Sequence, residues 1–265
     1  MSGPVIIIPA RYASTRFPAK PLAMLRGKDG VSKSLVQRSW EAACDVAGID
    51  AVYVATDDDR IASHVAEFGG RALMTPESCA NGTERCAAAL ELLDDEPEIV
   101  VNLQGDAPLT PAWFVEELVE ALRARPDVDM ATPVLRCDHG HWVALMGDRR
   151  EGRVGGTTAV FDDAMRALYF SKEVIPFVAP DKAAAMECLP VFHHVGVYAY
   201  RPDVLHAYGQ WPTGPLEAQE GLEQLRFLEQ GHTILCVETQ SRGRTFWELN
   251  NPEDIERIET ALHAS

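Results

Sequence analysis

A short run of apolar, mostly β-branched residues near the N-terminus, Val5-Ile6-Ile7-Ile8, constrains the fold most strongly. Such a run is typical of a strand buried on both faces, as in a parallel sheet that helices cover. Pro9 follows directly, and because proline cannot donate to a strand ladder, we expect the strand to end there. The run therefore predicts a parallel sheet whose first strand leads into a loop after Ile8.

Strand and helix patterns alternate along the following hundred or so residues. Strand character is found at residues 51–56, 72–75, 99–104 and 130–135, and helix character at residues 34–43, 60–68, 86–93 and 111–123. Ser34 and the run Asp57-Asp58-Asp59 stand where helix N-caps belong. Repeated strand–helix units predict a right-handed, doubly wound, mostly parallel α/β sheet.

The second half of the sequence has shorter and more varied patterns. Strands are expected at residues 157–161, 167–171, 192–200 and 233–237, helices at 216–230 and 252–263, and a loop at 176–190. No internal repeat or interdomain linker interrupts the chain. The sequence therefore predicts a single domain over residues 1–265, with a smaller β-rich lobe at about residues 150–215.

Composition excludes several classes of protein. The net charge of −16 argues against nonspecific nucleic-acid binding, which depends on neutralising phosphates. The six cysteines form no CxxC pair, so neither a zinc site nor a disulfide framework is expected. No apolar run has the length of a membrane span or of a signal peptide, and we therefore expect a cytoplasmic protein with no membrane partner.

The loop after the first strand is basic although the whole chain is acidic. From Met1 to Lys28 there are five basic residues and no acidic one, and the loop itself carries Arg11, Arg16 and Lys20. A basic segment at the end of a strand favours a site for a small polyanion. The alternative is a solvated loop whose cations bind nothing.

Two further loops are predicted at the same edge of the sheet, residues 81–85 and 105–109. In a parallel sheet the carboxyl ends of the strands meet at one edge, where ligands bind. Cations, a Gly-Thr turn and the carboxylate of Asp106 together are typical of nucleotidyl transfer with Mg²⁺. The first loop is neither GxxxxGK[ST] nor GxGxxG, so a P-loop NTPase and a dinucleotide dehydrogenase are not indicated.

The sequence resembles the 3-deoxy-manno-octulosonate cytidylyltransferase (CMP-Kdo synthetase) family in several motifs that occur in the same order. They are Ile8-Pro9-Ala10-Arg11-Tyr12-Ala13-Ser14-Thr15-Arg16-Phe17-Pro18-Ala19-Lys20-Pro21-Leu22, Val54-Ala55-Thr56-Asp57-Asp58, Asn81-Gly82-Thr83-Glu84-Arg85, Val101-Asn102-Leu103-Gln104-Gly105-Asp106, Ala167-Leu168-Tyr169-Phe170-Ser171, His194-Val195-Gly196-Val197-Tyr198-Ala199-Tyr200-Arg201, Leu222-Glu223-Gln224-Leu225-Arg226 and Asn251-Pro252-Glu253-Asp254. Each motif alone is weak, whereas the series spans nearly the whole chain.

The resemblance implies a homodimeric enzyme that joins CTP to an eight-carbon keto-acid sugar, releases pyrophosphate and belongs to lipopolysaccharide biosynthesis. It implies contact regions for the dimer in the β-rich lobe. The implied catalytic residues are Arg11, Lys20 and Asp106, and the implied Mg²⁺ ligands are Asp106 and Asn250. The nucleotide would contact Arg11, Ser14, Lys20, Gly82, Thr83 and Arg85. The sugar would contact Gln104, His194, Tyr198, Glu223 and Gln224.

Each role has a plain structural alternative. Lys20 could instead be a solvated lysine of the loop, and Asp106 could cap the next helix. His194 lies in an apolar strand, where a histidine often serves the core with both ring nitrogens satisfied. Glu223 and Gln224 are adjacent on an expected helix, so only one of them would point inward.

The chain departs from the family pattern at three positions. Ala107 replaces a glutamate, Lys172 replaces an arginine, and Asn250 stands where the family has a second metal-binding aspartate. An asparagine oxygen can ligate Mg²⁺ but lacks the negative charge. Three functions stay open: the Kdo enzyme; a paralogue that activates aminated Kdo, a sialic-acid-like sugar or a phosphonate; and a non-catalytic nucleotide-binding descendant.

Overall fold

The computed structural model describes residues 2–13, 17–154, 156–244, 249 and 251–264. The chain forms two compact units, each treated by itself below. The first unit comprises Met1–Val119, Ala199–Gln210 and Ser241–Ser265, and the second comprises Glu120–Tyr198 and Trp211–Gln240.

Four parallel strands form the centre of the first unit, in the order β5 (Arg71–Met74), β4 (Ala51–Thr56), β1 (Val5–Ala10) and β6 (Val100–Leu103). Almost all of β1 and all of β6 are buried. This agrees with the continuous apolar runs that a strand covered on both faces requires.

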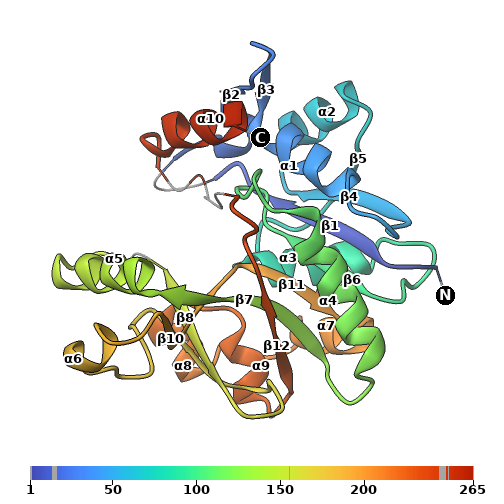
Figure 1. Cartoon of the computed structure of the whole chain (residues 1–265). Helices are drawn as coiled ribbons and strands as arrows, with labels where there is room; N and C mark the ends of the chain where they lie inside the picture. Colours follow the sequence, from blue (N-terminus) through green and yellow to red (C-terminus); the bar gives the residue numbers. More distant parts are fainter. Residues whose placement is uncertain (1, 14–16, 155, 245–248, 250, 265) are drawn as a thin grey trace. The chain divides into compact units, whose positions relative to one another are not determined.

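Helices connect these strands and determine where a ligand can enter. The chain runs from β1 through α1 (Leu35–Cys44) to β4 and through α2 (Asp59–Glu67) to β5 (Figure 1). It then passes through α3 (Gly82–Leu90) to β6, on the opposite side of β1. The strand order therefore reverses between β1 and β6, which is where ligands bind in doubly wound folds.

Smaller elements complete the first unit. The 3-10 helix η1 (Lys20–Leu22) and the antiparallel pair β2 (Met24–Arg26) and β3 (Ser32–Ser34) lie between β1 and α1 in the sequence. The last helix, α10 (Asp254–Ala264), packs through Ile258 against Leu25 and Leu35, and Leu249 belongs to the same buried cluster. Further helices are α7 (Pro202–Tyr208) and the start of α4 (Ala112–Ala124).

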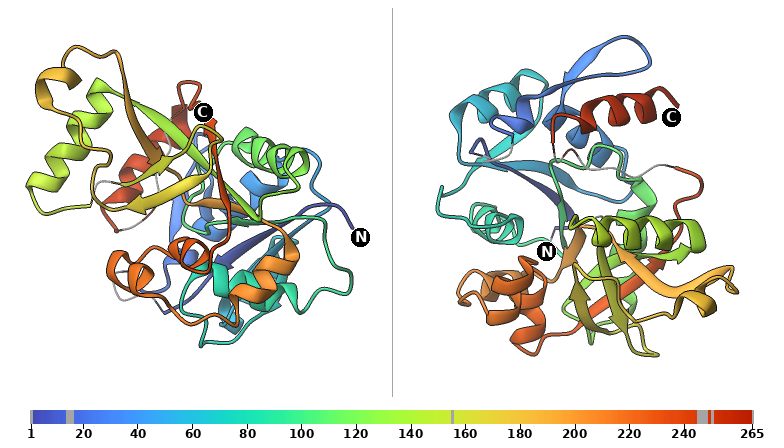
Figure 2. Two further views of the ribbon diagram at one scale, coloured as in Figure 1. Left: turned by 90° about the horizontal axis from the view of Figure 1, so that it is seen from below. Right: turned by 90° about the vertical axis from the view of Figure 1, so that its left-hand side faces the viewer.

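The second unit is built on antiparallel strands. β10 (Cys188–His194) pairs with β7 (Met130–Asp138) and with β8 (Thr157–Phe161), and β8 pairs with β9 (Ala167–Ser171). β12 (Ile234–Thr239) joins the other edge of β7 in parallel. The helices of this unit are α5 (His139–Arg150), α6 (Pro180–Ala183), α8 (Pro215–Glu220) and α9 (Leu225–Glu229), while β11 (Val197–Tyr200) is divided between the two units (Figure 2).

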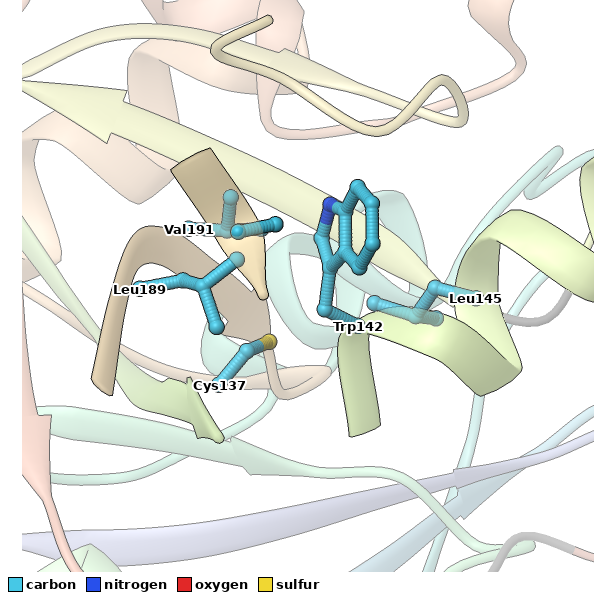
Figure 3. Close-up of a cluster of buried hydrophobic side chains, with 6 residues drawn as sticks. Cys137, Trp142, Leu145, Leu189 and Val191 are labelled. Atoms are coloured by element: carbon cyan, nitrogen blue, oxygen red, sulfur yellow. The ribbon is translucent and has the colours of Figure 1, made fainter. Parts of the chain in front are cut away.

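A separate hydrophobic cluster holds α5 to the strands of the second unit. Trp142 and Leu145 of α5 pack with Cys137, Leu189 and Val191, all buried (Figure 3). Burial raises the pKa of the Cys137 thiol to about 11, so this cysteine acts as a small apolar side chain. The helix is therefore fixed by core packing.

Several sequence expectations are confirmed. Ser34 accepts a hydrogen bond from the N–H of Gln37 and caps α1, and Asp58 accepts one from Arg60 and caps α2. The strands expected at residues 51–56, 157–161 and 167–171 have those bounds. The mostly parallel α/β architecture with a β-rich part is confirmed as well. The expectation of one domain over residues 1–265, with a lobe at about 150–215, stays a prediction.

The expectation that Pro9 ends the first strand is wrong. β1 continues to Ala10, and Pro9 is paired with Ala55 of β4. Successive backbone N–H groups point to opposite sides of a strand, so the nitrogen of Pro9 points to the same side as the N–H of Val5. The Val5 N–H donates to the carbonyl of Ile99, next to β6. Pairing with β6 ends at Ile7, so proline removes no ladder bond.

The expected loop at residues 81–85 is instead the first turn of α3. Asn81 caps this helix by accepting from the N–H of Glu84, whose carboxylate accepts in return from the N–H of Ala80. The pair is a variant of the capping box, because Glu84 accepts from the residue before the N-cap and not from the N-cap itself, and the Asn-x-x-Glu spacing was its signal.

Two long elements expected in the second half are each broken in two. Residues 192–200 belong to β10 and β11, separated at Val195-Gly196, and residues 216–230 belong to α8 and α9, separated at Gly221, whose φ is +62°. The helices α5 and α7 were missed, and the expected loop at 176–190 contains α6 and the start of β10.

Candidate active site

A cavity of about 240 Å³ opens in the first unit where β1 and β6 end. Its position agrees with the reversal of strand order between these two strands. Its lining includes the ends of both strands, the loop before η1 and the start of α3: Pro9, Ala10, Arg11, Lys20, Pro21, Leu35, Cys79, Asn81, Gly82, Arg85, Gln104, Gly105 and Asp106.

Lys20 and Asp106 form an ion pair within this cavity. Nζ of Lys20 lies 2.6 Å from Oδ2 of Asp106, and both side chains are partly buried. Ala19, the residue before Lys20, has a positive φ of 57°, a backbone conformation that alanine rarely adopts. The strained turn starts η1 at Lys20 and so positions its side chain.

Glycine is required where β6 ends, because a β-carbon at Gly105 would lie 2.7 Å from the carbonyl oxygen of Pro9. Ser39 of α1 donates to the carbonyl of Gly105 at 3.0 Å. The N–H of Leu249 donates to the carbonyl of Asp106 at 2.8 Å. Three segments distant in sequence therefore fix the backbone that presents the Asp106 carboxylate.

Gln104 lines the cavity opposite the start of α3. A β-carbon at Gly82 would lie 3.0 Å from Nε2 of Gln104, so the glycine allows the close approach. That Nε2 donates to Oδ1 of Asn102 at 3.3 Å. Asn102, fully buried in β6, thus helps to orient the Gln104 amide.

Thr83 does not line the cavity. Its hydroxyl lies 2.8 Å from the hydroxyl of Tyr200, which also accepts a hydrogen bond from Asn102 at 3.5 Å. All three side chains are completely buried. The structure therefore places Thr83 in a polar network behind the cavity wall, while its predicted contact with the nucleotide stays a prediction.

Arg85 lines the cavity but is almost completely buried and held by neighbours. Its guanidinium donates to Thr75 at 2.7 Å and to the carboxylate of Asp57 at 2.7 Å. Sequence reasoning treated Asp57 as a helix cap, a role that Asp58 takes. Arg11, in contrast, is an exposed cation at the cavity.

A second group of predicted residues gathers in the second unit. The rings of His194 and Tyr198 stack with centroids 5.6 Å apart, and the Tyr198 hydroxyl donates to Oε1 of Gln224 at 3.2 Å. Nε2 of Gln224 is buried with no hydrogen-bond partner in the described part of the chain. Glu223 is half-buried.

Burial also determines the charge of His194. It lowers the pKa of His194 to about 3, with a smaller contribution from His193, so the ring is neutral at physiological pH. Nε2 of His194 lies 2.9 Å from the hydroxyl of Thr132, a residue that sequence reasoning missed. The only sequence signal at Thr132 was one polar residue in an apolar strand, as with Asn102 in β6.

The structure thus divides the predicted site residues into two groups. Around one cavity of the first unit it brings Arg11, Lys20, Gly82, Arg85, Gln104 and Asp106. In the second unit it joins His194, Tyr198 and Gln224. Ser14 and Asn250 lie outside the described residues. Leu249, the neighbour of Asn250, is nevertheless bonded to Asp106 through the backbone.

A family model described as "Cytidylyltransferase" matches residues 5–234. A relative from Maricaulis maris (strain MCS10), named 3-deoxy-manno-octulosonate cytidylyltransferase, is 46% identical over 97% of this chain and 96% of its own. Another, from Shewanella amazonensis (strain ATCC BAA-1098 / SB2B), is named 8-amino-3,8-dideoxy-manno-octulosonate cytidylyltransferase and is 40% identical over 97% of each chain.

One solved structure, CMP:2-keto-3-deoxy-manno-octonic acid synthetase complexed with CTP, matches with a TM-score of 0.83. It is 33% identical, and the match covers 99% of both chains. None of the helices in the described part of this chain combines the length and apolar character of a membrane span.

Proposed function

The chain belongs to the cytidylyltransferase family, and we propose that it transfers the cytidylyl group of CTP to a 2-keto-3-deoxy sugar acid, Kdo or a close relative. The products would be the CMP-sugar and pyrophosphate. The relatives named for this reaction extend over almost the whole chain, which supports the same activity here.

The observation that carries this proposal is the cavity lined by Arg11, Lys20 and Asp106. In a chain of net charge −16, cations at the end of β1 provide a local site for a triphosphate. A solvated loop would not require Lys20 to be partly buried against the carboxylate of Asp106, which follows β6.

In the proposed reaction the anomeric hydroxyl of the sugar attacks the α-phosphorus of CTP. A phosphorus–oxygen bond to the sugar forms and the hydroxyl proton is released to water. The bond from the α-phosphorus to the oxygen shared with the β-phosphate breaks, and pyrophosphate leaves with both electrons of that bond. Lys20 and Arg11 would stabilise the charge that develops on the phosphate oxygens. Such catalysis depends mainly on positioning and charge neutralisation.

The donor set of the cavity fits a magnesium ion that binds together with CTP. Mg²⁺ typically uses one or two carboxylates and completes its shell with phosphates and water, and Asp106 supplies one carboxylate. Asp106, with Asn250 as a second candidate, would hold the ion. When bound, Mg²⁺ would neutralise phosphate charge. Lys20, freed from Asp106, would then be available to the phosphates.

We propose that the sugar acid contacts His194, Tyr198, Glu223 and Gln224 of the second unit, and Gln104 stays a separate proposed sugar contact at the cavity of the first unit. The support is the buried amide of Gln224, since an unpartnered Nε2 is costly unless a ligand accepts its hydrogen bond. Tyr198 orients this amide by donating to its oxygen. A polyhydroxylated acid offers suitable acceptors.

The acceptor could also carry an amino group, since one relative is named for the 8-amino sugar. We further propose a homodimer formed through the β-rich part, a cytoplasmic location and a role in lipopolysaccharide biosynthesis. Exposed Leu168 and Phe177 in that part support the dimer. Cysteines without a CxxC pair agree with a reducing compartment.

Pyrophosphate release with CTP, Mg²⁺ and a panel of acids tests the proposal. The panel contains Kdo, 8-amino Kdo, a sialic acid and a phosphonate. Preference for Kdo or 8-amino Kdo supports the proposal and identifies the acceptor. Preference for another acid, or no release with any, would refute it in favour of a different transferase or a non-catalytic binding protein.

A further inference from the structure

The hydroxyl of Thr132 in β7 has three polar neighbours. Its Oγ1 lies 2.9 Å from Nε2 of His194, 2.9 Å from the carbonyl oxygen of Val197 and 3.3 Å from that of Val195. Thr132 is completely buried, and His194 is only 6% exposed. Buried polar groups are hydrogen-bonded, so these contacts determine where the protons lie.

A threonine hydroxyl has one proton to donate and two lone pairs, whereas carbonyl oxygens can only accept. The carbonyl of Val195 already accepts from the N–H of Val197 at 2.7 Å. The Thr132 proton therefore belongs to the carbonyl of Val197. If it pointed to His194 instead, two oxygen–oxygen contacts at 2.9 and 3.3 Å would have no hydrogen between them.

With its proton used in this way, Thr132 can only accept from His194. Nε2 of His194 must then carry the hydrogen. Because the buried ring is neutral, its second nitrogen, Nδ1, carries none and is a hydrogen-bond acceptor. Within the described residues, nothing donates to Nδ1.

We propose that Thr132 is a positioning residue that holds His194 in the Nε2–H tautomer and so prepares Nδ1 to accept a hydrogen bond from a hydroxyl or amino group of the sugar acid. The second half of this statement rests on the proposed function, whereas the first half rests on the contacts alone. Stacking on Tyr198 and edge contact with Phe170 keep the ring from turning over.

The tautomer can be measured directly. Long-range ¹H–¹⁵N correlation spectra of the ¹⁵N-labelled protein separate the protonated ring nitrogen from the unprotonated one, and His194→Gln identifies the signals. We expect hydrogen on Nε2 in the wild type and in Thr132→Ser. Thr132→Val, which keeps the shape but lacks the acceptor, should populate the Nδ1–H form.

Kinetics test the role in substrate binding. Thr132→Val should raise the KM for the sugar acid about tenfold, the factor that corresponds to one hydrogen bond of about 1.4 kcal/mol. The KM for CTP should change less than about twofold, and Thr132→Ser should restore the wild-type value. Thr158→Val is the matched control, because Thr158 is equally buried in the same unit. Its hydroxyl donates to the carbonyl of Glu173 at 2.7 Å and accepts from the N–H of Ile175 at 3.1 Å, and within the described residues it forms no hydrogen bond to a histidine.

The possible failures are distinguishable. Hydrogen on Nδ1 in the wild type would overturn the tautomer assignment whatever the variants do, including a Thr132→Val protein that does not fold. A correct tautomer with equal KM changes in Thr132→Val and Thr158→Val would overturn the substrate role. No turnover of any sugar acid by the wild type would instead refute the proposed function, while the spectra would still decide the tautomer.

Discussion

At the scale of single residues, Lys20 and Asp106 neutralise each other across 2.6 Å. Each is proposed to meet a different part of the substrate, Lys20 the phosphates and Asp106 the metal ion. The ion pair holds both side chains at the cavity, and CTP with Mg²⁺ would replace one partner of each. A variant that removes one of the two charges should therefore change phosphate binding and metal binding differently.

The first prediction concerns Asp106→Asn. Mg²⁺-dependent turnover should fall on the order of 10²-fold or more, because Asp106, the one carboxylate that the described residues contribute to the cavity lining, loses its charge. CTP binding without Mg²⁺ should become tighter, because Lys20 no longer pairs with an anion. Steady-state kinetics and calorimetry measure the two effects. Asp127→Asn, which breaks the exposed Arg125–Asp127 pair, is the control; full turnover in Asp106→Asn would refute the metal assignment.

A second prediction concerns Gly105→Ala. The added β-carbon would meet backbone oxygen of Pro9 at 2.7 Å, so the strand ends must move apart. We expect the free energy of unfolding to fall by about 2 kcal/mol, with a loss of turnover. In urea titrations, Gly147→Ala is the matched control: nothing lies near its β-carbon, and alanine should stabilise α5 by about 0.5–1 kcal/mol. Equal stability of the two variants would contradict this account.

For single helices and strands, the sequence predicted the end of an element correctly where one side chain determines it. Ser34 and Asp58 cap their helices as the sequence indicates. The prediction at Pro9 was wrong because a proline removes a ladder hydrogen bond only on a side of the strand that is paired. Whether the β6 side of β1 is still paired at Pro9 depends on the register between β1 and β6. The bend at Val195-Gly196 likewise follows from tertiary hydrogen bonds, such as that from Val195 to Pro133.

In the candidate site, too, the sequence predicted some residues and missed others. The motifs identified the residues that line the cavity, because the carboxyl ends of parallel strands meet at one edge. The supporting contacts of Asn102 with Tyr200, of Thr132 with His194 and of Asp57 with Arg85 could not be predicted from sequence, because each joins residues that are far apart in the chain. Such contacts exist only once the strands are in register.

The strand β10 leads to a prediction about pH. Burial lowers the pKa of His194 to about 3, whereas the unfolded chain has a histidine pKa of about 6.5. Below about pH 6.5 the unfolded state therefore binds the additional proton, and the free energy of unfolding falls as pH decreases toward 3, by up to about 1.4 kcal/mol per pH unit. Above about pH 7 this contribution is complete.

Urea unfolding at about pH 7 and about pH 5 measures the slope. His194→Gln should reduce the slope because glutamine cannot be protonated, while His193, whose pKa burial lowers to about 4, keeps its own contribution. Carboxylates contribute equally to both proteins, so the difference between the two slopes reports on His194. Identical slopes would show that His194 is protonated as readily in the folded state.

In the molecule as a whole, the acidic chain places Arg11 and Lys20, the cations proposed to bind CTP, after one strand, and large apolar side chains are exposed elsewhere. Leu168 is 64% exposed and Phe177 is 87% exposed, both in the part expected to form the dimer. Large exposed apolar side chains are candidates for a protein–protein contact when they form one patch, and a charged substitution at one of them tests this.

We predict that Phe177→Asp converts a dimer into a monomer, because a buried, unpaired carboxylate at the contact is costly. Sedimentation velocity of both proteins measures the change. Leu92→Asp is the control, since Leu92 is 50% exposed in the first unit, outside the expected contact region. A wild-type monomer, or a dimer that survives Phe177→Asp, would refute this contact.

Whether this chain joins CTP to a keto-acid sugar can be measured by ³¹P NMR of one reaction mixture. With CTP, Mg²⁺, Kdo and the protein, we predict that the three CTP resonances are replaced by a phosphodiester resonance and pyrophosphate in equal amounts. The same mixture with Lys20→Ala should retain most of its CTP. CTP that stays intact with the wild type, for both Kdo and 8-amino Kdo, would contradict the account.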